Sequence, residues 1–167
     1  MRFNIIKYPI ILLALILLQK SFISVIALSK LNITPDIVLI AVIYIGIKEG
    51  KIGGSVYGFF AGLLLDILSG SFVGLLALAY TVSGFVAGFF KTEGDRFLSK
   101  YNFLLVTFIC SLISCFLYYG LYSQGTSTGF ADVMLLYVFT SATYTTLISM
   151  VILVIPKRKT LERGFTD

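Results

Sequence analysis

Long apolar runs, separated by short polar connections, occupy almost the whole of this 167-residue chain. Most of these runs approach the length of about 20 residues that a helix needs to cross the hydrocarbon core of a bilayer. At roughly 28 residues for each span with its turn, the chain holds six spans and no extramembrane domain. We therefore predict one polytopic membrane domain over residues 1–167. The predicted segments are 5–28, 35–47, 52–68, 72–90, 103–122 and 133–155.

The composition excludes the soluble classes of protein. Hydrophobic residues make up 58% of the chain and charged residues 13%, whereas soluble domains average about 45–50% and about 25%. So few charges cannot cover a surface this apolar, which excludes a soluble enzyme and a disordered chain. The predicted fold is an all-α integral membrane protein, a bundle of six transmembrane helices. Its second helix, at about 13 residues, is short for a span and is expected to be partly buried.

The basic residues predict the orientation of this bundle. Of the 13 Lys and Arg residues, 11 lie at one set of segment ends, and Lys30 alone lies at the other set. Lys20 falls inside the first segment. By the positive-inside rule, both termini are predicted to be cytoplasmic.

The first segment has a competing interpretation as a secretory signal. It has a basic start and an apolar stretch, and Ala27-Leu28-Ser29 resembles a weak cleavage site. Gln19 and Lys20 interrupt the apolar stretch well before that site, which favours a retained first helix.

No residue pattern indicates catalysis or cofactor binding. The chain contains no His and no Trp, which excludes His bases and His metal ligands. Cys110 and Cys115, five apart on a predicted helix, face different directions and are interpreted as small buried hydrophobes. No P-loop, metal-ligand cluster or paired-carboxylate motif is present. We therefore predict no enzyme, no metal, no cofactor and no nucleic-acid partner.

Small residues recur at helical spacing in the third segment. Gly54, Gly58, Gly62, Asp66 and Gly70 stand every four residues and so form one stripe along a helix. Such a stripe allows another helix to approach closely. The approaching helix belongs either to the same bundle or to a partner.

The fourth segment carries a second small-residue stripe. Its members are Ala77, Thr81, Gly84 and Gly88. Gly84 and Gly88 join the third-segment glycines as candidates for a packing or partner interface.

Asp66 is an acid inside a predicted span, where a charge is costly. It is either a capping or hydrogen-bonded structural acid near the outer interface, or a polar contact in a cavity or to a partner. Lys20 lies at a similar predicted depth, about 22 Å along its helix. The two residues are thus a candidate intramembrane pair, unless Lys20 extends to the outer head groups.

The second segment begins with a helix-start motif. We expect Thr34 as the N-cap, Pro35 at the first helical position and Asp36 in the first turn.

Hydroxyl side chains form one stripe on each of the last two segments. They either bond to carbonyls of their own helix or line a shared polar seam or pocket. The residues are Thr107, Ser111, Ser114 and Tyr118, and then Ser141, Thr145 and Ser149.

Several of these motifs together resemble the rod shape-determining protein MreD family. The similar parts are Pro35-Asp36-Ile37-Val38-Leu39, the block 58–70 (GFFAGLLLDILSG), Gly74-Leu75 and the stretch 84–88; Gln19 also fits. The resemblance covers about residues 10 to 90, and the rest by length and topology. Lys20 is not a feature associated with the family.

The resemblance implies a non-enzymatic inner-membrane subunit of the bacterial cell-elongation machinery. The implied partner is MreC, a bitopic protein, within an assembly that includes a wall polymerase–transpeptidase pair and the MreB filament. The implied fold is similar to the substrate-binding subunits of energy-coupling-factor vitamin transporters. A vitamin-type binding subunit of a transporter is therefore the second hypothesis, and a lipid-modifying enzyme the third.

Overall fold

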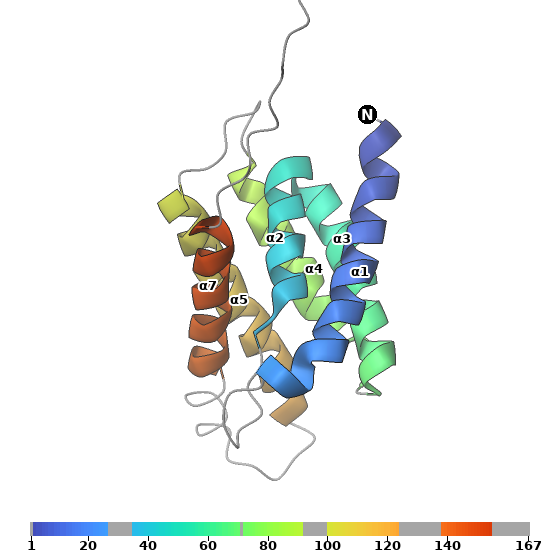
Figure 1. The fold of residues 1–167 in the computed structure, drawn as a ribbon, viewed down its shortest axis with the longest axis vertical. Coiled ribbons are helices and arrows are strands. Elements are labelled where there is room, and N and C mark those ends of the chain that lie inside the picture. The colour runs from blue at the N-terminus through green and yellow to red at the C-terminus, as the bar shows by residue number, and fades with distance from the viewer. Residues whose placement is uncertain (1, 27–34, 71, 92–99, 124–137, 155–167) are drawn as a thin grey trace, which may run out of the picture.

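The computed structural model describes residues 2–26, 35–70, 72–91, 100–123 and 138–154 (Figure 1). Within these ranges the chain forms six α-helices and no strand. The helices are α1 (Arg2–Ile26), α2 (Ile37–Glu49), α3 (Lys51–Ser69), α4 (Leu75–Ala87), α5 (Lys100–Ser123) and α7 (Phe139–Val154), with a short 3-10 helix, η1 (Gly88–Phe90), after α4.

Successive helices run in opposite directions through the bundle (Figure 1). α1, α3 and α5 therefore begin at one end, where α2, η1 and α7 finish. We name it the basic end, because the described residues Lys7, Lys48, Lys51 and Lys91 lie there. This arrangement agrees with the predicted grouping of basic residues, while the orientation in a membrane stays a prediction.

α2 is the central helix of the bundle. It contacts α1, α3, α4, α5 and α7. Buried residues occupy all sides of it, from Val38 to Ile47. A helix that is apolar all round is expected to be buried. The short second segment is thus enclosed by its neighbours.

The bundle carries polar side chains inside and apolar ones outside. α5 buries Thr107 and Ser111, while its Leu105 is 60% exposed. α7 buries Ser149, while its Leu147 is 60% exposed. In water, exposed leucines and buried hydroxyl groups would both be unfavourable. A bilayer instead favours apolar side chains on the outside and polar groups that find partners inside. The distribution of side chains therefore matches a lipid environment.

Two of the described helices are long and apolar enough to cross a membrane, over Lys51–Ser69 and Tyr101–Tyr122. Two shorter apolar helices span Leu75–Phe90 and Phe139–Leu153. An all-helical fold is confirmed for the described residues. The spanning of a membrane by all six helices stays a prediction.

Two predicted helix starts are wrong by a few residues. The N-cap of α2 is Asp36, which accepts a hydrogen bond from Leu39 N–H at 3.0 Å, so Pro35 precedes the helix instead of opening it. Thr34 lies outside the described residues. α4 begins at Leu75 and not at Phe72, because Gly74 adopts a positive φ of 107° that ends the preceding turn.

Candidate functional site

The glycine stripe of α3 faces α4. Gly54, Gly58 and Gly62 are buried, and a Cβ added at any of them would collide with the backbone of α4. The added Cβ at Gly58 meets the carbonyl group of Tyr80, and the one at Gly62 meets that of Leu76. The stripe therefore packs within the bundle, which is the intramolecular one of its two predicted roles.

Gly84 of α4 and Gly88 of η1 complete this contact. A Cβ at Gly84 would collide with the carbonyl group of Gly54, and one at Gly88 with the backbone of Lys51. Gly70 has a different role, because it is the C-cap of α3 and adopts the left-handed conformation with φ 63°. The two small-residue stripes thus pack against each other.

Gly46 of α2, which the sequence pattern did not predict, also takes part in this contact. A Cβ there would lie 2.7 Å from the Gly84 carbonyl oxygen, and the Cα of Gly46 lies 2.8 Å from a Cβ built at Gly54. Three backbones therefore meet at Gly46, Gly54 and Gly84. Its position as an isolated glycine within an apolar helix could have indicated a close packing contact.

Asp66 caps the beginning of α4. Its Oδ2 atom accepts hydrogen bonds from the N–H groups of Gly74 at 2.9 Å, Leu76 at 3.1 Å and Ala77 at 3.2 Å. These N–H groups belong to a helix start that has no side-chain cap of its own, since its N-cap residue is Gly74. The carboxylate also lies at the positive end of the helix dipole. The interpretation of Asp66 as a capping acid agrees with these contacts.

Lys20 and Asp66 have different hydrogen-bond partners in the structure. The Lys20 ammonium group donates to Ser69 Oγ at 2.7 Å, one turn beyond Asp66 on α3. Asp66 is fully buried and holds the start of α4. A direct pair between the two stays a prediction.

The start of α2 is joined to three other helices. The Tyr80 hydroxyl of α4 donates to Asp36 Oδ2. Gln19 Oε1 of α1 accepts from Val38 N–H at 3.1 Å, and Thr145 Oγ1 of α7 accepts from Asp36 N–H at 3.2 Å. The Pro35-Asp36 motif therefore marks a junction of α1, α2, α4 and α7, and Asp36 is its centre.

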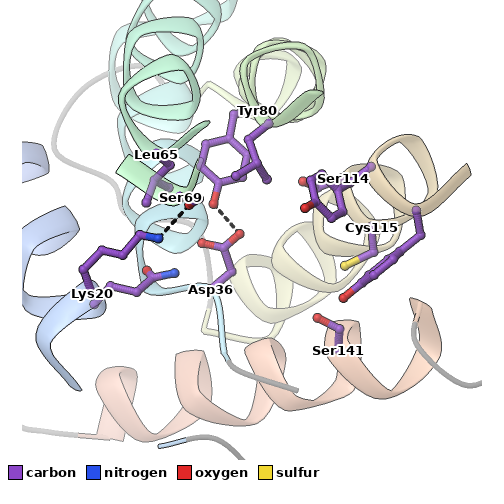
Figure 2. A pocket seen from close by; sticks show the side chains of 12 residues that line it. Lys20, Asp36, Leu65, Ser69, Tyr80, Ser114, Cys115 and Ser141 are labelled. Carbon is purple, nitrogen blue, oxygen red and sulfur yellow. Dashed lines mark hydrogen bonds between the residues drawn. The ribbon is translucent and has the colours of Figure 1, made fainter. Parts of the chain in front are cut away.

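A polar cavity of about 200 Å³ lies beside this junction (Figure 2). It is at the end of the bundle opposite the basic end, where α1 and α3 finish and α2 begins. Lys20, Asp36 and Tyr80 border it, and their polar atoms lie close together in Figure 2. The remaining lining residues are Gln19, Leu65, Ser69, Leu76, Ser114, Cys115, Tyr118, Tyr119 and Ser141.

The two hydroxyl stripes contribute to this cavity only at one end. Ser114 and Tyr118 of α5 and Ser141 of α7 line it. Farther along α5, Thr107 bonds to the Phe103 carbonyl of its own helix. Ser111 and Ser149 are fully buried, and their hydroxyl oxygens have no hydrogen-bond partner among the described residues. Both predicted roles of the stripes therefore occur.

The cysteines are not joined in a disulfide. Cys110 is buried, and its carbonyl oxygen accepts a hydrogen bond from the Ser83 hydroxyl at 3.1 Å, which ties α5 to α4. Across the described residues, no group of three or more Cys, Asp and Glu side chains is placed to hold a metal ion.

Comparison with known families identifies the chain. The family model described as rod shape-determining protein MreD matches residues 1–159. The chain belongs to the MreD family. Neither the curated proteins nor the solved structures gave a significant match.

The MreD family is one of rod-shape-determining membrane proteins, and it is not a known enzyme family. Membership agrees with the apolar exterior of the bundle and with its two helices of spanning length. Because the family belongs to the rod-shape complex, protein partners are expected for this chain.

Proposed function

We propose that this chain is a non-enzymatic, multi-pass subunit of the bacterial cell-elongation complex in the inner membrane, with both termini cytoplasmic. It binds an MreC-like bitopic partner and so supports peptidoglycan synthesis. The wall polymerase–transpeptidase pair and the MreB filament are its indirect partners. The family match over residues 1–159 carries this proposal.

The packing of the bundle narrows where the partner binds. α4 already packs against the glycine face of α3, so the partner's transmembrane helix binds an outward apolar face. Four helices each present such a face with an exposed apolar residue. These residues are Phe60 of α3, Leu78 of α4, Leu105 of α5 and Leu147 of α7.

Photo-crosslinking tests this proposal. A photoreactive phenylalanine analogue is placed at each of these four positions in turn, in cells that carry the native partner. The buried Phe103 position is the matched control, because the analogue there replaces a side chain of similar size. We expect one face to crosslink an MreC-like protein, and depletion of the chain to round the cells. Four faces without that crosslink, in cells that keep their rod shape on depletion, contradict the proposal.

The polar cavity supports a second candidate function, a small-molecule binding subunit of a transporter. Under that hypothesis, depletion leaves cell shape intact and abolishes uptake of a vitamin-type substrate. Measuring shape and uptake in the same depleted cells separates the two functions.

A further inference from the structure

One basic and one acidic side chain border the cavity, and they are not joined to each other. Among the described residues, no ion pair links Lys20 and Asp36, although both border the cavity. Lys20 donates to Ser69, and an ammonium group has two more protons to donate. Asp36 accepts from Tyr80, from Leu39 and from the Gln19 side chain, and a carboxylate, with about four acceptor sites, has capacity for one more donor.

The volume of the cavity limits what it holds. A cavity of about 150 Å³ takes a six-carbon ring such as benzene. By proportion, about 200 Å³ takes a group of about eight non-hydrogen atoms. The size of phosphoethanolamine, about eight non-hydrogen atoms, fits this volume.

The position of the cavity also matters. It lies where α3 ends, next to the exposed Ser69, and Lys20 reaches it from the side of α1. In a membrane-embedded bundle this level is that of the lipid head groups. The binding of a head-group-sized polar molecule is therefore geometrically possible without crossing the apolar exterior.

We propose that this cavity binds a small zwitterion of the phosphoethanolamine type. Its phosphate contacts the Lys20 ammonium group and the Ser69 hydroxyl, and its primary ammonium donates to the Asp36 carboxylate. The zwitterion is either the head group of a phosphatidylethanolamine lipid or a free molecule. Phosphatidylcholine matches the charges but has no N–H to donate to Asp36, so it is discriminated against.

Native mass spectrometry of the purified full chain tests the site. The chain is equilibrated with equal amounts of phosphatidylethanolamine and phosphatidylcholine of the same acyl chains. We expect about tenfold more retained phosphatidylethanolamine, the ratio that about 1.4 kcal/mol gives. Lys20→Met removes this retention, whereas Lys7→Met, an exposed lysine of the same helix, keeps it.

Asp36→Asn separates selectivity from folding. Asn is as good an N-cap as Asp, and its NH2 group donates to the Tyr80 hydroxyl where the carboxylate had accepted from it, so the start of α2 survives. We expect this variant to retain the two lipids about equally, because the acceptor charge for the primary ammonium is gone.

Free phosphoethanolamine distinguishes the two sources. If it displaces the retained lipid or raises the melting temperature of wild type but not of Lys20→Met, the site accepts the soluble zwitterion. Retention of the lipid without any such effect assigns the site to the head group. Equal retention of both lipids by wild type with no effect of phosphoethanolamine overturns the proposal. So does unchanged retention of phosphatidylethanolamine in Lys20→Met, or equal binding of phosphatidylglycerol.

Discussion

Gly62 and Asp66 lie one turn apart on α3 and act on α4 in different ways. Gly62 lets the two backbones touch, and Asp66 binds the first N–H groups of α4. In a bilayer, no hydrophobic effect drives helices together, so contacts of this kind are what hold them. Changes at these two residues therefore have large and separable effects.

Gly62→Ala is expected to destabilise the bundle, because the new methyl group meets the backbone of Ala77. Forcing a methyl group into a packed site costs about 1–3 kcal/mol. The melting temperature in detergent measures the effect. Gly120→Ala on α5 is the matched control, since its methyl group meets nothing within 4 Å. Equal melting temperatures for the two variants contradict close packing at Gly62.

Asp66→Ala is expected to loosen the start of α4. Three N–H groups lose their acceptor in a buried place, at a cost of about 1–3 kcal/mol for each group that finds no other acceptor. Hydrogen exchange should accelerate at Gly74, Leu76 and Ala77 before it does elsewhere in α4. Ser55→Ala, which removes a hydroxyl bonded to its own helix, should leave these amides unchanged. Unaltered protection in Asp66→Ala would exclude a capping role.

Among the helices, α2 depends most on its neighbours. It is about 20 Å long, from 13 residues at about 1.5 Å each, and its first turn is bound by side chains of α1 and α4, as well as by its own cap. Its stability therefore comes from tertiary contacts and not from its own length.

Tyr80→Phe tests this dependence. The change keeps the ring and removes the hydroxyl that donates to the Asp36 carboxylate. Losing a hydrogen bond to a charged group costs about 1.5–3 kcal/mol. We expect faster hydrogen exchange in the first turn of α2 and a lower melting temperature. Tyr101→Phe is the control, because Tyr101 is 80% exposed. Matching exchange rates in both variants would show that the hydroxyl contributes nothing.

For the molecule as a whole, the alternating helices predict which residues face which side of the membrane. In a background with both native cysteines replaced, Lys91→Cys at the basic end should resist an impermeant thiol reagent added outside intact cells. Phe72→Cys at the opposite end should be labelled, as Phe72 is 65% exposed. The reverse pattern would invert the predicted orientation.

The apolar runs and glycine spacing were sufficient to predict the helices and the close-packed face, because both depend on residues near in sequence. The partners of Asp66 and Asp36 were not predictable in the same way. They depend on the turn at Gly74 and on how α4 lies against α2, which brings Tyr80 to Asp36 across 44 positions. Gly46 was not predicted for the same reason. A single glycine forms no repeating pattern in the sequence, and its role depends on which helix packs against it.

The shortness of the fourth apolar helix has a consequence for the surrounding lipid. α4 and η1 together form an apolar helix over Leu75–Phe90, and Leu78 and Phe85 face outward from it. Its length of about 25 Å is less than the hydrocarbon thickness of about 30 Å. Such hydrophobic mismatch thins the bilayer locally, and this thinning costs free energy for each ångström of mismatch. The cost is lower in thinner membranes and beside proteins whose hydrophobic surface is equally short. The α4 side of the bundle thus favours location of the protein in thin regions of the membrane.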